Sequence, residues 1–145
     1  MLKRNGFTLI ELLLSIATIA VIAGFSVPLY LRAQTKNDLD VAAQSYAQAL
    51  RRAQVLSVGV QDDSSWGVRA ESGKIVIFKG ISYSGRDVNY DEQTSIPGNM
   101  SLSAPTEIYF SKLFGTPNST PSLTLTSVQN DVKTITINSK GLVDY

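Results

Sequence analysis

The sequence predicts an α+β protein, with one long amino-terminal helix followed by an antiparallel two-sheet β head. Three observations support this class. Residues 12–31 carry no charge, residues 39–56 repeat apolar side chains at three- and four-residue steps, and after Gly59 the pattern changes to alternation. A period near 3.6 residues indicates a helix, and a period of two indicates strands. In a chain of 145 residues we expect one globular domain beyond the apolar segment.

The first half of the helix is predicted to cross a membrane. A run of about 20 apolar residues spans the roughly 30 Å of bilayer hydrocarbon as a helix. Inside lipid every backbone group needs an internal partner, so a single segment must be helical. Lys3 and Arg4 precede the run and are expected to hold the front end in the cytoplasm, with the head outside. Gly24 and Pro28 are predicted to loosen and kink this helix, since proline removes one helical hydrogen bond.

One carboxylate interrupts the apolar surroundings. Glu11 lies between Ile10 and Leu12, and no Lys, Arg or His occurs from Phe7 to Leu31. A charged side chain within a membrane segment costs on the order of 2.5–3.5 kcal/mol and usually has a partner. Either Glu11 lies shallow enough to reach lipid head groups, as in a simple signal anchor, or its partner is on another molecule.

The residues around Glu11 form a motif. The apolar run is preceded by Lys3-Arg4-Asn5-Gly6 and opens with Phe7-Thr8-Leu9-Ile10-Glu11. This combination resembles the class III signal of type IV prepilins and type II secretion pseudopilins. The resemblance implies that a membrane-embedded prepilin peptidase cuts between Gly6 and Phe7, and that the new amino terminus at Phe7 is N-methylated. It also implies that Glu11 pairs with the Phe7 amine of a neighbouring subunit. Pro28 fits as well, because pilin helices often carry a proline at that depth.

This resemblance divides the chain into four segments. They are a cytoplasmic leader peptide at 1–6, a transmembrane and filament-core helix at 7–31, an amphipathic continuation at 32–58 and a globular β head at 59–145. The implied partners are other pilin or pseudopilin subunits, the prepilin peptidase/N-methyltransferase and an inner-membrane assembly platform. We expect a single-pass protein of the inner membrane whose head lies outside the cytoplasm, and which later enters a periplasmic or cell-surface filament.

The composition excludes several functions. The chain has no Cys and no His, so disulfides, zinc sites, thiol nucleophiles and histidine bases are excluded. We therefore expect no enzyme, no catalytic residue, no metal and no cofactor. Removing Lys3 and Arg4 with the leader reduces 13 basic residues to 11, against 12 acidic ones. A nearly neutral exported chain argues against a head built for polyanions.

The second half of the helix is predicted to be amphipathic. Its opposite side carries Asp40, Gln44, Gln48 and Arg51, and Gly59 is the predicted stop. The apolar stripe comprises Leu39, Ala42, Ala43, Tyr46, Ala49, Leu50, Ala53 and Leu56. We expect this stripe to pack under the head.

Short alternating segments predict the strands of the head. Trp66–Ala70 and Lys74–Lys79 flank a turn at 71–73, and the second is expected to be central because Ile75–Phe78 is apolar on both faces. Ile81–Asn89 is predicted to be a loop, with at most a short strand near Val88. Further strands are predicted at Met100–Ser103, Glu107–Phe110, Leu123–Thr126, Lys133–Asn138 and Leu142–Val143, with a loop at Gly115–Pro121.

A long helix followed only by strands resembles the H-type pseudopilins and the FimT-like minor pilins. The hairpin around Ser65-Trp66-Gly67-Val68 and the closing segment Ile135–Val143 carry this looser resemblance. Our primary hypothesis is a minor pilin of a type IV pilus-like filament. The alternatives are an H-type pseudopilin of a type II secretion system and a DNA-binding minor pilin used in DNA uptake. Against DNA binding, the carboxyl-terminal region offers only Lys133 and Lys140, beside Asp131 and Asp144.

Two acidic clusters in the head are candidate sites. The segment from Asp87 to Asp91 begins like a calcium loop, but Glu92 replaces the required glycine and Gly98 the bidentate glutamate. The neighbouring pairs Asp62-Asp63 and Asp91-Glu92 have the carboxylates that acid–base chemistry uses, which leaves a membrane-anchored enzyme as a further class. No pocket-forming motif accompanies them, and solvated turns are the simpler interpretation.

Overall fold

The computed structural model of the protein describes residues 6–103 and 107–145. The chain forms two compact units, an amino-terminal unit that ends at Gln34 and a head that runs from Thr35 to Tyr145. One helix, α1, spans Leu9–Val58 and contributes to both units. The predicted leader charges Lys3 and Arg4 lie outside the described part of the chain.

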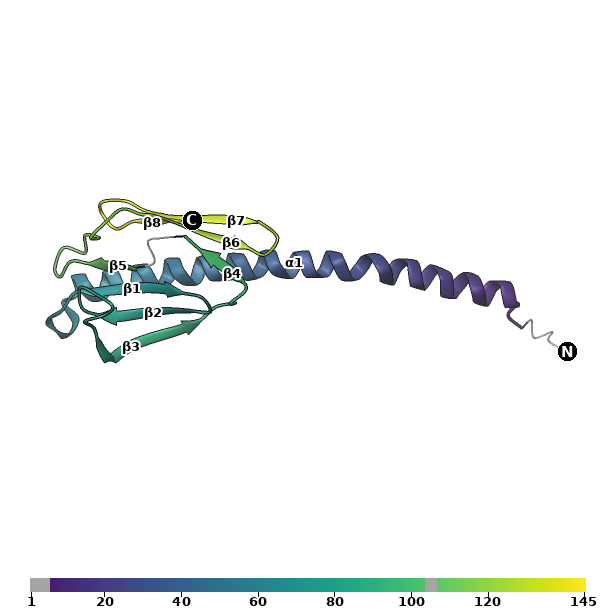
Figure 1. Ribbon diagram of the computed structural model, residues 1–145, viewed down its shortest axis with the longest axis horizontal. Coiled ribbons are helices and arrows are strands. Elements are labelled where there is room, and N and C mark those ends of the chain that lie inside the picture. Colours follow the sequence, from purple (N-terminus) through teal and green to yellow (C-terminus); the bar gives the residue numbers. More distant parts are fainter. Residues whose placement is uncertain (1–5, 104–106) are drawn as a thin grey trace. The chain divides into compact units, whose positions relative to one another are not determined.

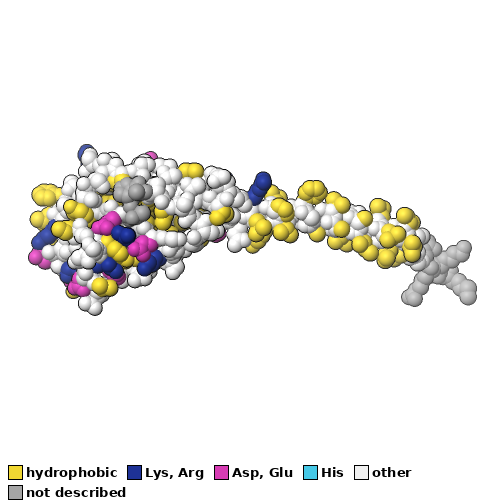
Figure 2. All heavy atoms as spheres, in the orientation of Figure 1, with side chains coloured by type: hydrophobic (Ala, Val, Ile, Leu, Met, Phe, Trp, Pro, Cys, Tyr) yellow, Lys and Arg dark blue, Asp and Glu magenta, His cyan; other side chains and the backbone are white. Residues whose placement is uncertain are grey.

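The amino-terminal unit consists of the first part of α1. This helix is long and apolar enough to cross a membrane, by length and composition, and Figure 2 shows hydrophobic side chains along it. The hydroxyls of Ser15, Thr18 and Ser26 donate hydrogen bonds of 2.7–2.8 Å to carbonyl oxygens four residues earlier. These polar groups are therefore satisfied within the helix, as an environment without water requires.

The helix continues unbroken through Gly24 and Pro28. Pro28 has no N–H, and the carbonyl it would otherwise bond, four residues earlier, belongs to Gly24. Gly24 has open space where a Cβ would lie. The two residues therefore weaken the same turn of α1, and the kink itself stays a prediction.

The head contains two antiparallel four-stranded sheets, which confirms the predicted α+β class. The first sheet has the order β3-β2-β1-β5, and the second has the order β4-β6-β7-β8. Strands β1–β3 and strands β6–β8 lie on opposite sides of the head portion of α1 in Figure 1. The strand bounds in the first sheet are Trp66–Glu71 (β1), Lys74–Lys79 (β2), Asp87–Ser95 (β3) and Glu107–Phe110 (β5). Those in the second are Met100–Leu102 (β4), Ser122–Ser127 (β6), Val132–Ile137 (β7) and Val143–Asp144 (β8).

The core of the head is built on α1. All but one of the residues in the predicted stripe are buried, and Leu56 is partly buried at its edge. Ala47 and Ser57 are buried as well, so the buried face is broader than one stripe. The cause is that α1 shares its core with strands of both sheets, including Val68 and Leu125. The predicted stop is confirmed, since α1 ends at Val58.

Strand β2 is central, as its two apolar faces predicted. Ile75 and Ile77 belong to the core cluster around α1. Val76 and Phe78 alternate with them and are buried outside that cluster. The Phe78 ring lies against Gly67 of β1 and makes an edge-to-face contact with Tyr83, 5.6 Å between centroids. The segment that follows β2 therefore covers a second, smaller core on the outer face of the first sheet.

The predicted loop at Ile81–Asn89 is wrong only in its last three residues, 87–89. Strand β3 begins at Asp87 and runs for nine residues to Ser95, far longer than the short strand allowed near Val88. Its side chains are mostly exposed and show no apolar alternation. Backbone pairing with β2, interrupted by a bulge between Ile77 and Lys79, holds this strand. Hydrophobic periodicity cannot detect an edge strand of this kind.

Candidate functional site

The predicted cleavage site lies just before α1. Gly6 and Phe7 are exposed and non-helical, and α1 begins at Leu9. The Thr8 hydroxyl oxygen accepts a hydrogen bond from the Glu11 backbone N–H at 3.3 Å. Threonine followed three residues later by glutamate is the capping-box pattern, which satisfies N–H groups that a helix start leaves without partners. Thr8 therefore fixes the start of α1 and leaves the Gly6–Phe7 bond outside the helix.

The Glu11 side chain is exposed in the first turn of α1. A carboxylate at this position is favoured by the positive end of the helix dipole. Among the described residues, none of the ion pairs involves Glu11. The described part of the chain thus supplies a cap and a dipole for Glu11 but no cation.

The helix behind Glu11 presents a nearly continuous apolar surface. Each of its large apolar side chains exposes half or more of its area. They are Leu12, Leu13, Leu14, Ile16, Ile19, Val21, Ile22, Phe25, Val27, Leu29, Tyr30 and Leu31. A surface of this extent is far larger than the apolar patches of soluble monomers and marks a lipid or protein contact.

The acidic clusters of the head are engaged in ion pairs. Asp63 pairs with Lys112, whose ammonium holds the pKa of the Asp63 carboxyl below its usual range. Arg86 Nε donates to both carboxylate oxygens of Asp91 at 3.0 Å, and the Asp91 side chain is only 4% exposed. Charge-assisted hydrogen bonds of this kind stabilise structure, and they engage Asp63 in one acidic cluster and Asp91 in the other.

The segment that begins like a calcium loop is part of strand β3. Asp87 pairs with Lys79 across the sheet, and Glu92 pairs with Ile77. An extended strand cannot wrap its carboxylates around one ion as a calcium loop does. Within residues 6–103 and 107–145, no group of three or more His, Cys, Asp or Glu side chains could hold a metal.

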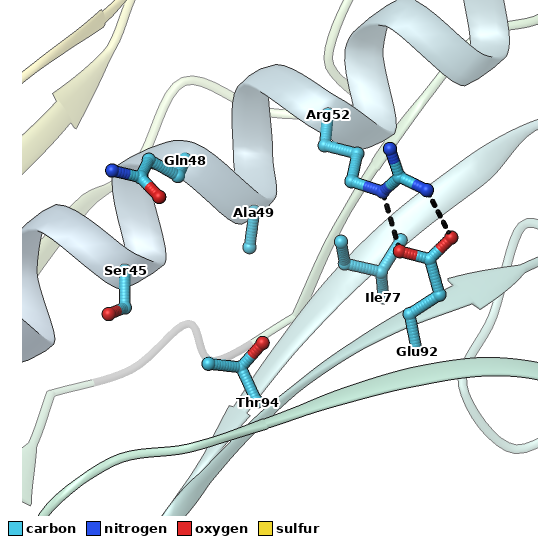
Figure 3. Close-up of a pocket in the computed structure, with 7 residues that line it drawn as sticks. All are labelled: Ser45, Gln48, Ala49, Arg52, Ile77, Glu92 and Thr94. Atoms are coloured by element: carbon cyan, nitrogen blue, oxygen red, sulfur yellow. Dashed lines mark hydrogen bonds and ion pairs between the residues drawn. The ribbon is translucent and has the colours of Figure 1, made fainter.

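A small cavity of about 160 Å³ lies between α1 and strands β2 and β3. Figure 3 shows the Arg52 guanidinium directed at the Glu92 carboxylate, with two hydrogen bonds of 2.5 and 2.6 Å. The pairing holds the pKa of Glu92 below its usual range. The other lining residues are Ser45, Gln48, Ala49, Ile77 and Thr94. The two charged side chains that line the cavity, Arg52 and Glu92, pair with each other, and this ion pair connects β3 to α1. The lining residues include no nucleophile with an adjacent free base.

A cation–aromatic cluster holds the segment after β2. The guanidinium groups of Arg69 and Arg86 both lie over the Tyr83 ring, 4.7 and 3.7 Å from its centroid. The Tyr83 backbone N–H donates to Glu107 at 2.8 Å, and its carbonyl accepts from Arg86 at 2.7 Å. These contacts hold the segment over the small outer core, so we interpret the cluster as structural.

Sequence reasoning missed two positioning residues. Thr8 had a readable signal, because the capping-box spacing to Glu11 is present in the sequence. Gln54 had none. Its amide nitrogen donates to the carbonyls of Gly115 and Lys140 at 3.0 and 2.9 Å, tying a loop of each sheet to α1. These partners are 61 and 86 residues away in sequence, so only the folded structure reveals them.

Two comparisons bear on the site. Residues 1–27 match the family described as the prokaryotic N-terminal methylation motif. The fold is similar to the solved structure of the minor pseudopilin EpsH from the type 2 secretion system of Vibrio cholerae, with a TM-score of 0.53 and 14% sequence identity. That alignment covers 74% of this chain and 94% of the other. No curated protein sequence matches the chain.

Proposed function

We propose that this chain is a minor structural subunit of a type IV pilus-like filament. Its methylation motif and its pilin-like fold support a protein of the type IV prepilin or pseudopilin kind. The observation that carries the proposal is the motif itself. Gly6, Phe7 and Glu11 stand in prepilin spacing directly before residues 12–31, an uncharged stretch of α1 whose large apolar side chains are exposed. A structural role fits this family and the paired state of the carboxylates in the head.

The proposed mechanism is assembly through α1. The helix is inserted in the inner membrane with the head outside, and prepilin peptidase removes residues 1–6. This creates a positive amine at Phe7, which is then methylated. On docking, Glu11 pairs with the Phe7 amine of a neighbouring subunit. Two charges that leave water together avoid most of the cost that either would carry alone.

A second candidate is an H-type pseudopilin of a type II secretion system. The fold similarity to EpsH, a protein of that system, favours it. A type IV pilus subunit and a pseudopilin share the same processing and assembly steps, so the motif does not separate them. Imaging of surface fibres in a deletion strain distinguishes the two. Lost or fewer fibres indicate a pilus subunit, whereas unchanged fibres with a loss of protein secretion indicate a pseudopilin.

A role in DNA uptake has less support. Of the two lysines near the carboxyl terminus, Lys133 lies 2.9 Å from Asp40 of α1 in an ion pair. A phosphate contact would have to compete with this pair. We expect no gel shift of DNA by the detergent-solubilised chain at low salt, and a shift would restore this candidate.

The experiment that tests the assembly mechanism is the substitution Glu11→Ala in the full chain. We expect normal removal of the leader. The amount of protein recovered with the filament fraction should fall at least about tenfold, which corresponds to a loss of about 1.4 kcal/mol in binding free energy. Glu11→Asp, which keeps the charge on a shorter side chain, is the matched control and should retain partial incorporation. Normal incorporation of Glu11→Ala would contradict the pairing.

A further inference from the structure

Four exposed apolar side chains lie at the end of α1 in the head, and we call them the terminal patch. They are Val55 and Val58 of α1 and Leu113 and Phe114 of the loop after β5, exposed by 69%, 49%, 60% and 80%. The Leu113 N–H donates to the Ser57 carbonyl at 3.0 Å, which places the loop against the last turn of the helix. Single exposed apolar residues need no explanation, whereas a cluster of four indicates a contact surface.

The loop that carries the patch is held by specific contacts. Ser111 N–H donates to the Thr116 carbonyl at 2.8 Å, and Gly115 N–H donates to the Ser111 carbonyl at 2.9 Å. The Lys112 N–H donates to the Ser65 hydroxyl at 3.2 Å, and its ammonium pairs with Asp63. The structure therefore fixes Leu113 and Phe114 in position, which lowers the conformational entropy that this loop would lose on binding a partner.

The backbone of this loop is strained in a way that burial does not explain. Leu113 has φ of +72°, a left-handed conformation that costs a non-glycine residue on the order of 1 kcal/mol or more. Gly115, at φ of +62°, brings the loop so close to Val58 that a Cβ there would lie 2.5 Å from the Val58 side chain. Strain maintained to display two apolar side chains to solvent is typical of a binding surface.

Two basic side chains near the terminal patch are already engaged. Lys112 pairs with Asp63, and Arg51 donates to the Val143 carbonyl at 3.2 Å and lies over the Tyr145 ring. The side chains of the four patch residues carry neither a charge nor a polar group. The partner must accordingly be apolar and must not need hydrogen bonds from its contact surface.

We propose that the terminal patch receives the uncharged amino-terminal helix of a neighbouring subunit, with Phe114 as the aromatic anchor. This chain itself shows such a helix: residues 12–31 are uncharged and exposed along the segment. A helix satisfies its own backbone groups and offers grooves between rows of side chains, into which leucine and phenylalanine insert. The inference rests on the proposed function, since it needs filament assembly.

The test places the photocrosslinking residue p-benzoylphenylalanine at position 114 of the full chain in cells. Position 128 is the matched control, because Val128 is 68% exposed and lies outside the patch. Crosslinked products are digested and identified by mass spectrometry. We expect position 114 to crosslink to the uncharged helix of a mature filament subunit, at residues 7–31 of this chain or the equivalent segment of another subunit with the same amino-terminal motif. Position 128 should not.

Other products at position 114 overturn the inference. These are crosslinks to a subunit head, to lipid alone or to any protein without the motif, and the absence of a crosslink. In parallel, Phe114→Ser should lower incorporation at least about tenfold relative to Val128→Ser, while both variants melt like the parent chain in detergent. If Glu11→Ala abolishes incorporation but Phe114→Ser does not, the terminal patch is refuted and the assembly mechanism stands. If neither variant lowers incorporation, the assembly mechanism itself fails.

Discussion

The two halves of α1 differ in where their apolar side chains lie. In the amino-terminal unit the helix is uncharged from Leu12 to Leu31 and exposes its large apolar side chains along that stretch. In the head it buries Leu39, Tyr46 and Leu50 completely and exposes Gln44 and Arg51. The head therefore has its own core, whereas the amino-terminal unit buries none of its residues from 6 to 34 and must obtain apolar contacts from lipid or from other chains. Substitutions in the first half should change where the protein goes, and substitutions in the second half should change whether it folds.

The substitution Gly6→Val should have the largest effect, and it should leave the head unaffected. A branched side chain at the predicted scissile bond is expected to block removal of residues 1–6. Immunoblots of membrane fractions should show only the longer species, with an unchanged melting temperature of the detergent-solubilised chain. Gly24→Val, which changes another amino-terminal glycine with open space around it, serves as the control. Normal mature size for Gly6→Val would contradict the assigned cleavage site.

The substitution Gly67→Val should affect only the head. A Cβ at Gly67 would lie 2.4 Å from the Phe78 ring and 2.8 Å from the Ile108 carbonyl oxygen. The backbone neighbour cannot move away freely, so we expect a loss on the order of 3 kcal/mol in the free energy of unfolding. Gly85→Ala, where a Cβ meets nothing within 4 Å, should change it little. Thermal melting of the full chain in detergent compares the two variants. Equal melting temperatures for Gly67→Val and Gly85→Ala would refute the assigned packing.

The substitution Gln54→Ala should have an intermediate effect on the head. It removes two hydrogen bonds and leaves the carbonyls of Gly115 and Lys140 without that donor. We expect a loss of about 1–2 kcal/mol in the free energy of unfolding. Gln48→Ala, on the exposed face of the same helix, should stay within about 0.5 kcal/mol of the parent. If the two variants unfold alike, Gln54 does not tie the loops to α1.

Acid should have the smallest effect, again confined to the head. The pKa of Glu92 is lowered by the Arg52 hydrogen bond, and that of Asp63 by Lys112. A carboxyl with a lowered pKa adds stability above its unfolded pKa, near 4 for Asp and Glu, and loses it as the pH falls through the folded value. The Glu92 side chain is 42% exposed, so we expect its share to stay below about 1 kcal/mol. Between pH 6 and pH 3, the melting temperature should fall less steeply for Glu92→Gln than for the parent chain. Equal falls in melting temperature would contradict the pairing.

The same comparison shows what the sequence could predict. The exposed apolar half of α1 and the buried stripe were readable because each has a strong pattern, and β2 was correctly placed as central because both of its faces are apolar. Strand β3 was not predicted, because its exposed side chains carry no apolar alternation and its backbone pairing with β2 leaves no signal in the sequence. Gln54 and the terminal patch depend on contacts between segments far apart in sequence, which local patterns do not encode. Processing, methylation and Glu11 pairing stay predictions.

The most direct test of the proposed assembly role is intact mass spectrometry of the native protein extracted from membranes. It reads the amino terminus and its modification in one measurement. A chain that begins at Phe7 and carries an added methyl group is the predicted result, and Gly6→Val should instead retain Met1. A native chain that begins at Met1 without methylation would contradict the account.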